Sequence, residues 1–258
     1  MSRDSIGHTL IVAVILCVAC SLLVSGAAVG LKPRQMLNKE RNSQKKILEL
    51  TGLYDPEVPI AESFKSIETQ VVNLDTGEYV SDIDPNAFDQ RRAARDPALS
   101  ESIPSGEDVA GIVRRENDSI VYLVNKSGKL DQIVMPVRGT GLWSTMYGYL
   151  ALDHDGTTVR GITFYEHGET PGLGGEIDNS KWQASWIGKH IFDQGGELKI
   201  NVIKGMVDTA KPNAEYEIDG ISGATITANG VTNMIHYWMG PKGFGPYLHR
   251  LQEEGVVQ

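Results

Sequence analysis

Residues 120–165 read IVYLVNKSGKLDQIVMPVRGTGLWSTMYGYLALDHDGTTVRGITFY and contain four short runs rich in β-branched and aromatic side chains. We expect these runs to be strands, at Ile120–Val124, Gln132–Val137, Met146–Leu152 and Val159–Tyr165. Gly128 and the stretch His154-Asp155-Gly156 supply turns between them. Successive strands with short connections pair antiparallel. The segment therefore predicts the centre of a mainly antiparallel sheet.

Further elements are expected on both sides of these strands. Residues 68–80 have the pattern of a hairpin, and the polar residues 82–106 that of a surface excursion with one short helical turn. After the strands, a helix is expected from Ser180, a strand at Leu198–Ile203 and a last helix at Thr227–Met239. Strand pairs with interspersed helices and no regular βαβ rhythm predict an α+β fold in one domain.

The N-terminal segment, residues 1–32, is predicted to be a single-pass membrane anchor. No Asp, Glu, Lys or Arg occurs between Asp4 and Lys32, and a helix of that length crosses a hydrocarbon core of about 30 Å. A signal peptide cleaved near Ser25-Gly26-Ala27-Ala28, or a lipoprotein signal ending at Cys20, is the alternative. The apolar run is long for a signal peptide, which favours the uncleaved anchor.

Charge is distributed unevenly along the chain, which carries a formal charge of −9. A juxtamembrane helix is predicted at residues 33–52, with Pro33 in its first turn. Its basic residues suit anionic lipid headgroups as a partner. The alternative is that these residues form a solvated helix face. The predicted soluble domain, residues 53–258, is acidic, which argues against nucleic acid as a partner. The positive-inside rule alone places this domain in the cytoplasm, but long domains translocate largely regardless of charge.

Common catalytic and metal-binding motifs do not occur in the sequence. There is no P-loop, no G-x-G-x-x-G after a strand, no G-x-S-x-G and no zinc-like spacing of the six histidines. No cysteine follows Cys20, so four thiolates for an iron–sulfur cluster are missing from the soluble part. We therefore predict no catalytic residue and no metal site in this chain.

The segment DGISGATIT, residues 219–227, leads directly into the last predicted helix. Small residues at Gly223 and Ala224 let a ligand approach the backbone closely. The first turn of a helix has unpaired N–H groups and the positive end of the dipole, which favour a phosphate over Ser222–Thr227. A Ser or Thr cap after a glycine turn is the simpler interpretation of the same residues.

Two motifs carry a resemblance to a known family. Ser222-Gly223-Ala224-Thr225, preceded by Asp219, resembles the flavinylation motif of membrane redox subunits. The stretch HGETPGLG, residues 167–174, resembles the H-x-E-T-P-G-x-G stretch of the FMN-binding domain in the C subunits of Na+-translocating NADH:quinone oxidoreductases. Length, the single span and the order of the motifs extend the resemblance over nearly the whole chain. The FMN-bearing G subunits of Rnf-type electron transport complexes are similar as well.

The resemblance implies FMN bound covalently, as a phosphoester on the Thr225 hydroxyl. From the residues themselves we expect backbone groups near the motif to hold the phosphate, an apolar wall to face the ring, and polar groups to meet its edge, where a lysine would favour the reduced, anionic flavin. The other candidate contacts are Ser222, Gly223, Ala224 and Thr227 for the phosphate, Leu142, Trp143, Leu173 and Gly174 for the ring, and Glu169, Thr170 and Lys204 for the edge.

Other residues near the motifs are expected to have structural roles. The four glycines at 168, 172, 174 and 175 suggest a loop whose backbone lies against a flat ring. His167 is expected to hold this loop by a hydrogen bond, with proton donation to reduced flavin as the alternative. The side chains of Trp182, Trp186 and Trp238 are expected in the core.

By resemblance, the chain is an electron-transfer subunit of a complex that couples NADH:quinone oxidoreduction to Na+ export. It is not catalytically complete alone, so the other subunits of the complex and a flavin transferase are implied as partners. The implied location is the bacterial inner membrane, with the soluble domain in the periplasm because the transferase of this family looks like an exported enzyme. The alternatives are an FMN-bearing G subunit of an Rnf-type electron transport complex and a non-redox, membrane-anchored binding or assembly module, with the Ser-Gly-Ala-Thr turn only a helix cap.

Overall fold

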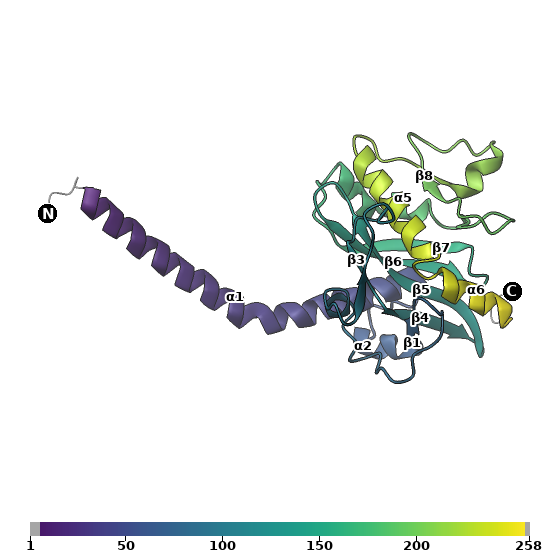
Figure 1. Cartoon of the computed structure of the whole chain (residues 1–258), viewed down its shortest axis with the longest axis horizontal. Coiled ribbons are helices and arrows are strands. Elements are labelled where there is room, and N and C mark those ends of the chain that lie inside the picture. The colour runs from purple at the N-terminus through teal and green to yellow at the C-terminus, as the bar shows by residue number, and fades with distance from the viewer. Residues whose placement is uncertain (1–5, 256–258) are drawn as a thin grey trace. The chain divides into compact units, whose positions relative to one another are not determined.

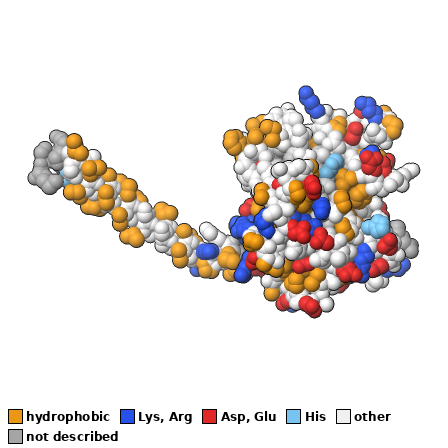
Figure 2. Space-filling view, in the orientation of Figure 1, with side chains coloured by type: hydrophobic (Ala, Val, Ile, Leu, Met, Phe, Trp, Pro, Cys, Tyr) orange, Lys and Arg blue, Asp and Glu red, His pale blue; other side chains and the backbone are white. Residues whose placement is uncertain are grey.

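The computed structural model describes residues 6–255, which form two compact units, one ending at Ser43 and one beginning at Gln44. Helix α1, Ile6–Thr51, contributes to both (Figure 1). In the described part of the chain it is the one helix long and apolar enough to cross a membrane. Hydrophobic side chains cover its outer part, whereas acidic and basic side chains are interspersed over the globular unit (Figure 2).

The prediction that a separate helix begins at Pro33 is wrong. Pro33 lies inside α1, which continues without interruption to Thr51. A proline inside a helix removes one backbone hydrogen bond, but good helix formers on both sides, such as Leu31 and Arg34, allow the helix to continue. The globular unit accordingly includes the last turns of this helix, from Gln44 onward.

A five-stranded antiparallel sheet forms the centre of the globular unit, in the order β1-β4-β5-β6-β7. Its strands are β1 (Ile67–Asn73), β4 (Asp118–Lys126), β5 (Lys129–Thr140), β6 (Thr145–Asp153) and β7 (Val159–Glu166). The four strands predicted between residues 120 and 165 are confirmed as its four consecutive members. The predicted α+β fold is confirmed as well.

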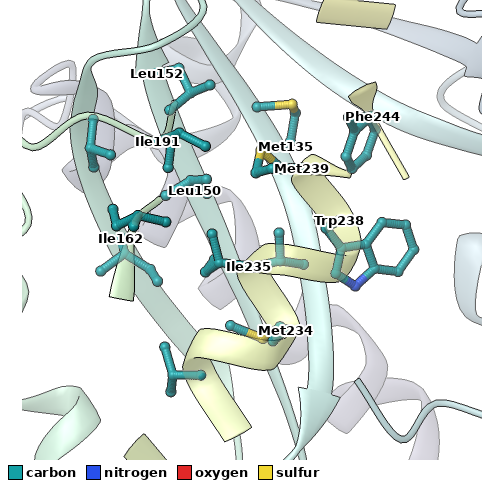
Figure 3. Packing of buried hydrophobic residues seen from close by; sticks show 14 of the residues in the cluster. Met135, Leu150, Leu152, Ile162, Ile191, Met234, Ile235, Trp238, Met239 and Phe244 are labelled. Atoms are coloured by element: carbon teal, nitrogen blue, oxygen red, sulfur yellow. The ribbon is translucent and has the colours of Figure 1, made fainter. Parts of the chain in front are cut away.

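Both faces of the sheet are covered, because successive side chains point to opposite sides. Leu123 belongs to a large cluster with helix α5 (Thr225–Met239), and its neighbour Tyr122 packs against a smaller cluster on the other face. In that smaller cluster Ile47 and Leu48, from the end of α1, are fully buried. Figure 3 shows α5 crossing the strands of the larger cluster. Burial on both faces fixes the sheet register and the position of α5.

Short elements connect and flank the sheet. They are α2 (Ile60–Ser63), η1 (Phe64–Ser66), α3 (Gln90–Ala93), β2 (Ser100–Ser102), β3 (Arg114–Glu116), η2 (Gly174–Asp178), α4 (Ser180–Ala184), β8 (Asn201–Val202), η3 (Pro212–Tyr216), β9 (Glu217–Ile218) and α6 (Gly245–Glu253).

Several predicted elements are shorter than expected. The second arm of the 68–80 hairpin is one bridge, Val72 to Tyr79, and β4 pairs with the other edge of β1. The strand expected at Leu198–Ile203 is reduced to β8, which pairs in parallel with β9. The polar excursion contains the expected helical turn, α3, and also β2, which pairs with β3. The pairings of β1 with β4, β8 with β9 and β2 with β3 all join residues distant in sequence.

Candidate functional site

The turn that precedes α5 is held in place from two sides. The indole Nε1 of Trp182 donates to the carbonyl of Asp219 at 2.8 Å, and the Asp219 carboxylate accepts from the N–H of Val207 at 2.7 Å. The N–H of Gly220 donates to the carbonyl of Gly205 at 2.7 Å. Trp182 is buried, as expected of a core residue. The backbone leading to the Ser-Gly-Ala-Thr motif is therefore fixed before the helix begins.

Helix α5 begins without a side-chain cap. Its N-cap residue is Ala224, and no side chain of the described residues caps the helix end. The first turn of a helix leaves its N–H groups without intrahelical partners, and Thr225 is the first helical residue, with its side chain exposed. Gly223 precedes it with φ +72°, a left-handed conformation that glycine adopts readily. An exposed hydroxyl thus lies among unpaired N–H donors.

The simpler interpretation, a Ser or Thr cap at this helix, is not what the structure has, and Thr227 is no cap. Thr227 lies in the first turn and is almost completely buried, and its hydroxyl donates to Oε2 of Glu169 at 2.5 Å. The helix begins two residues earlier than predicted, because Ala224 can occupy the N-cap position once the preceding turn is fixed by other contacts.

Glu169 lies at the centre of the site and is buried. Its Oε1 accepts from the N–H of Trp143 at 2.9 Å, and its Oε2 accepts from the N–H of Leu142 at 3.1 Å and from the Thr227 hydroxyl. Burial alone would raise the pKa of Glu169, but the hydrogen bonds from Thr227, Trp143 and Leu142 together outweigh it and hold the pKa below its ordinary value. The carboxylate is therefore ionised at neutral pH.

Two glycines allow this close packing around Glu169. A Cβ at Gly141 would lie 2.5 Å from Oε1 of Glu169, and a Cβ at Gly174 would lie 2.5 Å from the Thr227 hydroxyl oxygen. The glycine loop was expected to lie against a flat ring. For Gly174 the packing of the chain itself already requires a glycine.

Exposed apolar side chains occur at the start of α5, in the loop that borders the turn and in the segment bonded to Glu169. Leu142 is 48% exposed, Trp143 69%, Leu173 45% and Ile226 59%. A Cβ at Gly223 would lie 2.9 Å from Cδ2 of Leu173, so that leucine borders the motif directly. Clustered exposed apolar groups indicate a binding surface. The sequence predicted the first three, whereas Ile226 was missed because nothing in its helical spacing marks it as exposed.

The remaining candidates have less direct connections to the turn. Thr170 is exposed, and its carbonyl accepts from the N–H groups of Leu173 at 3.1 Å and Gly175 at 2.9 Å, which shapes the loop. Lys204 is exposed and precedes Gly205, which bonds to Gly220. Ser222 is exposed within the motif itself.

His167 has the loop-holding role that we expected. Its Nε2 lies 2.8 Å from a carboxylate oxygen of Asp178, and its Nδ1 accepts from the N–H of Glu169 at 3.2 Å. The N–H of Gly168 donates to the hydroxyl of Ser144 at 2.6 Å, a contact that the sequence did not suggest. These bonds join the glycine loop to the segment that carries Leu142 and Trp143.

The fold and the turn define a flavin-binding class of protein: the family model of the FMN-binding domain matches residues 141–240, which include Glu169 and Thr225. The chain is 46% identical over 256 residues to the C subunit of the Na(+)-translocating NADH-quinone reductase of Pseudomonas aeruginosa, covering 98% of each chain. It is 45% identical to the C subunit of the same reductase in Yersinia pestis, covering 98% of this chain and 95% of that one.

A solved structure agrees with these relatives. The fold matches the crystal structure of Shewanella oneidensis NqrC with a TM-score of 0.75 and 34% sequence identity. The match covers 83% of this chain and 98% of the NqrC chain. The chain therefore belongs to the family of Na(+)-translocating NADH-quinone reductase C subunits, and the resemblance seen in its motifs is confirmed.

Proposed function

We propose that this chain is the electron-transfer subunit of a membrane complex that couples NADH:quinone oxidoreduction to Na+ export, and that it carries FMN covalently on Thr225. Family membership supports the complex, and the FMN-binding domain supports the cofactor. The observation that carries the attachment site is the exposed Thr225 hydroxyl at the uncapped start of α5.

The residues around the turn fit an FMN phosphate and ring. Free N–H groups of the first turn suit the phosphate charge that remains after a phosphoester forms on Thr225. The exposed Leu142, Trp143 and Leu173 suit the ring as an apolar wall. Bound FMN supplies the capacity to accept and pass on electrons, whereas the protein's part is to hold and orient it.

Partners follow from what the sequence lacks. With no dinucleotide-binding motif in its sequence and one candidate span among residues 6–255, the chain relies on other subunits of the complex to oxidise NADH and to move Na+. A flavin transferase is required as well, because binding alone does not esterify an ordinary threonine. The basic residues between 32 and 46 are proposed to contact anionic lipid headgroups.

The globular domain is proposed to lie in the periplasm. Long domains cross the membrane largely regardless of their flanking charge, and an exported transferase must reach Thr225. A C-terminal fusion to alkaline phosphatase should be active. A C-terminal green fluorescent protein that fluoresces would instead place the domain in the cytoplasm.

Peptide mass mapping tests the attachment. The full chain, produced together with a flavin transferase, should show an FMN-sized mass on the peptide that holds residues 212–242. Thr225→Val removes the hydroxyl at nearly the same volume, so this mass should disappear from a folded protein. Ser222→Ala is the matched control and should keep the mass on the same residue. Persistence of the mass in Thr225→Val would contradict the assignment, and colourless wild-type protein would favour the binding module.

A further inference from the structure

We propose that Glu169 is a positioning residue for the flavin: its buried carboxylate fixes the apolar wall of Leu142 and Trp143 against the first turn of the helix that carries Thr225. This inference rests on the proposed covalent attachment of FMN to Thr225. It assigns Glu169 a different role from the direct contact with the ring edge that the sequence suggested.

The geometry joins three segments that are distant in sequence. Glu169 lies in the loop after β7, Leu142 and Trp143 lie between β5 and β6, and Thr227 lies in the first turn of α5. Both carboxylate oxygens are used within the chain, Oε1 by the N–H of Trp143 and Oε2 by the N–H of Leu142 and the Thr227 hydroxyl. The carboxylate of Glu169, called the anchor below, thus bonds both to the segment of Leu142 and Trp143 and to the helix that carries Thr225.

The chemistry of the anchor requires a carboxylate. All three of its partners are donors, and an ionised carboxylate only accepts hydrogen bonds. The amide group of a glutamine would turn an NH2 toward one of these donors and leave at least one of them unpaired. Among residues 6–255, no lysine or arginine lies within ion-pair distance of Glu169, so the neutral donors alone hold its charge.

The space around the anchor is filled on two sides. A Cβ at Gly141 would lie within 3 Å of Oε1 of Glu169, and a Cβ at Gly174 would lie within 3 Å of Oε2. Close backbone approach at both glycines leaves the carboxylate little freedom to move. Since buried groups in close packing transmit displacement to their neighbours, loss of the anchor should change the position of Leu142 and Trp143.

A covalent flavin makes positioning measurable separately from binding. The phosphoester keeps the flavin on the chain even when the wall is displaced, so weaker positioning appears as faster motion of the ring and not as loss of cofactor. Fluorescence anisotropy of the flavin reports that motion directly. A residue that served only to stabilise the fold would leave the anisotropy of the folded protein unchanged.

The experiment compares full-length chains in detergent, each produced with a flavin transferase. Glu169→Gln removes the carboxylate. Thr227→Val removes only the hydroxyl donor and keeps both backbone bonds, and Thr227→Ser restores the hydroxyl. Glu176→Gln is the matched control, since Glu176 lies in η2, directly after the loop that holds Glu169, and accepts from Nδ2 of Asn179 at 2.7 Å. Covalent flavin per chain, unfolding temperature and flavin anisotropy are measured for each.

We expect one covalent flavin per chain in the wild type and in the control, with equal anisotropy. Glu169→Gln and Thr227→Val should show a loss of anisotropy, larger for Glu169→Gln, and Thr227→Ser should recover the wild-type value. If Thr227→Val and Glu169→Gln both fold and keep the wild-type anisotropy, the positioning role of Glu169 is wrong, whereas the proposed function stands. If Glu169→Gln does not fold, the anisotropy of Thr227→Val alone tests the positioning role. Wild-type protein without covalent flavin would overturn the proposed function and this inference with it.

Discussion

Glu116 and Glu169 are both buried, but the chain stabilises their carboxylates in different ways. Glu116 forms an ion pair with Arg138, with Nη2 at 2.6 Å from Oε2, and also accepts from Nε2 of Gln90 at 2.5 Å. Glu169 has three hydrogen-bond donors and, among the residues that the structure describes, no cationic partner.

The way each carboxylate is stabilised indicates its role: the charge of Glu116 is structural, and the charge of Glu169 belongs to the proposed site. At Glu116 the opposite charge of Arg138 cancels the carboxylate, and the pair joins β3 to β5. At Glu169 the fixed dipoles stabilise the charge without cancelling it, so the negative charge of this carboxylate stays uncompensated. Buried charges are costly unless paired or hydrogen-bonded, and the chain uses one solution in the core and the other at the site.

The largest expected effect is on the core pair. Arg138→Met leaves Glu116 buried and unpaired, which should lower the free energy of unfolding by about 3–5 kcal/mol. Denaturant unfolding of the full-length protein in detergent measures it. Arg160→Met is the control: Arg160 is half-exposed and pairs with Asp153 at 3.0 Å, so its loss should cost less than about 1 kcal/mol. Equal costs for the two variants would contradict the structural role of Glu116.

A smaller loss of stability is expected at the flavin site. Glu169→Gln leaves at least one buried donor unpaired, which should lower the free energy of unfolding by about 1–3 kcal/mol. The fold should survive, because the sheet and the α5 packing do not depend on this carboxylate. A cost as large as that of Arg138→Met would mean that Glu169 supports the fold as much as the site.

The pH dependence of stability should also identify Glu169. Its pKa is lowered in the folded protein from the ordinary 4.5, so its contribution is fully present above about pH 4.5 and is lost as the pH falls through the lower folded value. The difference in unfolding free energy between wild type and Glu169→Gln should therefore shrink in this acidic range. A difference that stays constant from pH 6 down to that range would argue that the carboxylate is not held ionised.

The sheet could be predicted from the sequence because each of its strands has a local sequence pattern typical of a strand. Residues 120–165 have runs of β-branched and aromatic residues separated by tight turns, and these runs are buried on both faces of the sheet, so local pattern and tertiary contacts agree. The Pro33 region was mispredicted because a proline suits either the start or the interior of a long helix. The β8–β9 pairing was beyond reach because it joins residues distant in sequence.

At the site, the sequence indicates which residues gather but not how they bond. Thr225, Leu142, Trp143 and Leu173 were identified from motifs and apolar character, and the structure places them around one turn or in segments joined to it. The bonds of Glu169 could not be predicted, because a glutamate in a polar loop has no local pattern that distinguishes an internal anchor from an exposed ligand. Glu169 becomes an internal acceptor only because the folded chain brings three segments together: the loop after β7, the segment between β5 and β6, and the first turn of α5.

The smallest expected effect concerns the flavin's midpoint potential, and it tests whether the uncompensated charge matters for function. A nearby negative charge disfavours the reduced, anionic flavin, so Glu169→Gln should raise the potential of the loaded protein, by an energy on the order of 1 kcal/mol or less. Thr227→Val keeps the carboxylate but loosens the ring as well, so its shift measures the effect of ring mobility without loss of the charge. Spectroelectrochemical titration of the two full-length proteins measures the shifts. Equal shifts of the midpoint potential in the two variants would mean that ring mobility causes the effect. A lower potential in Glu169→Gln would show that the uncompensated charge of Glu169 does not disfavour the reduced flavin.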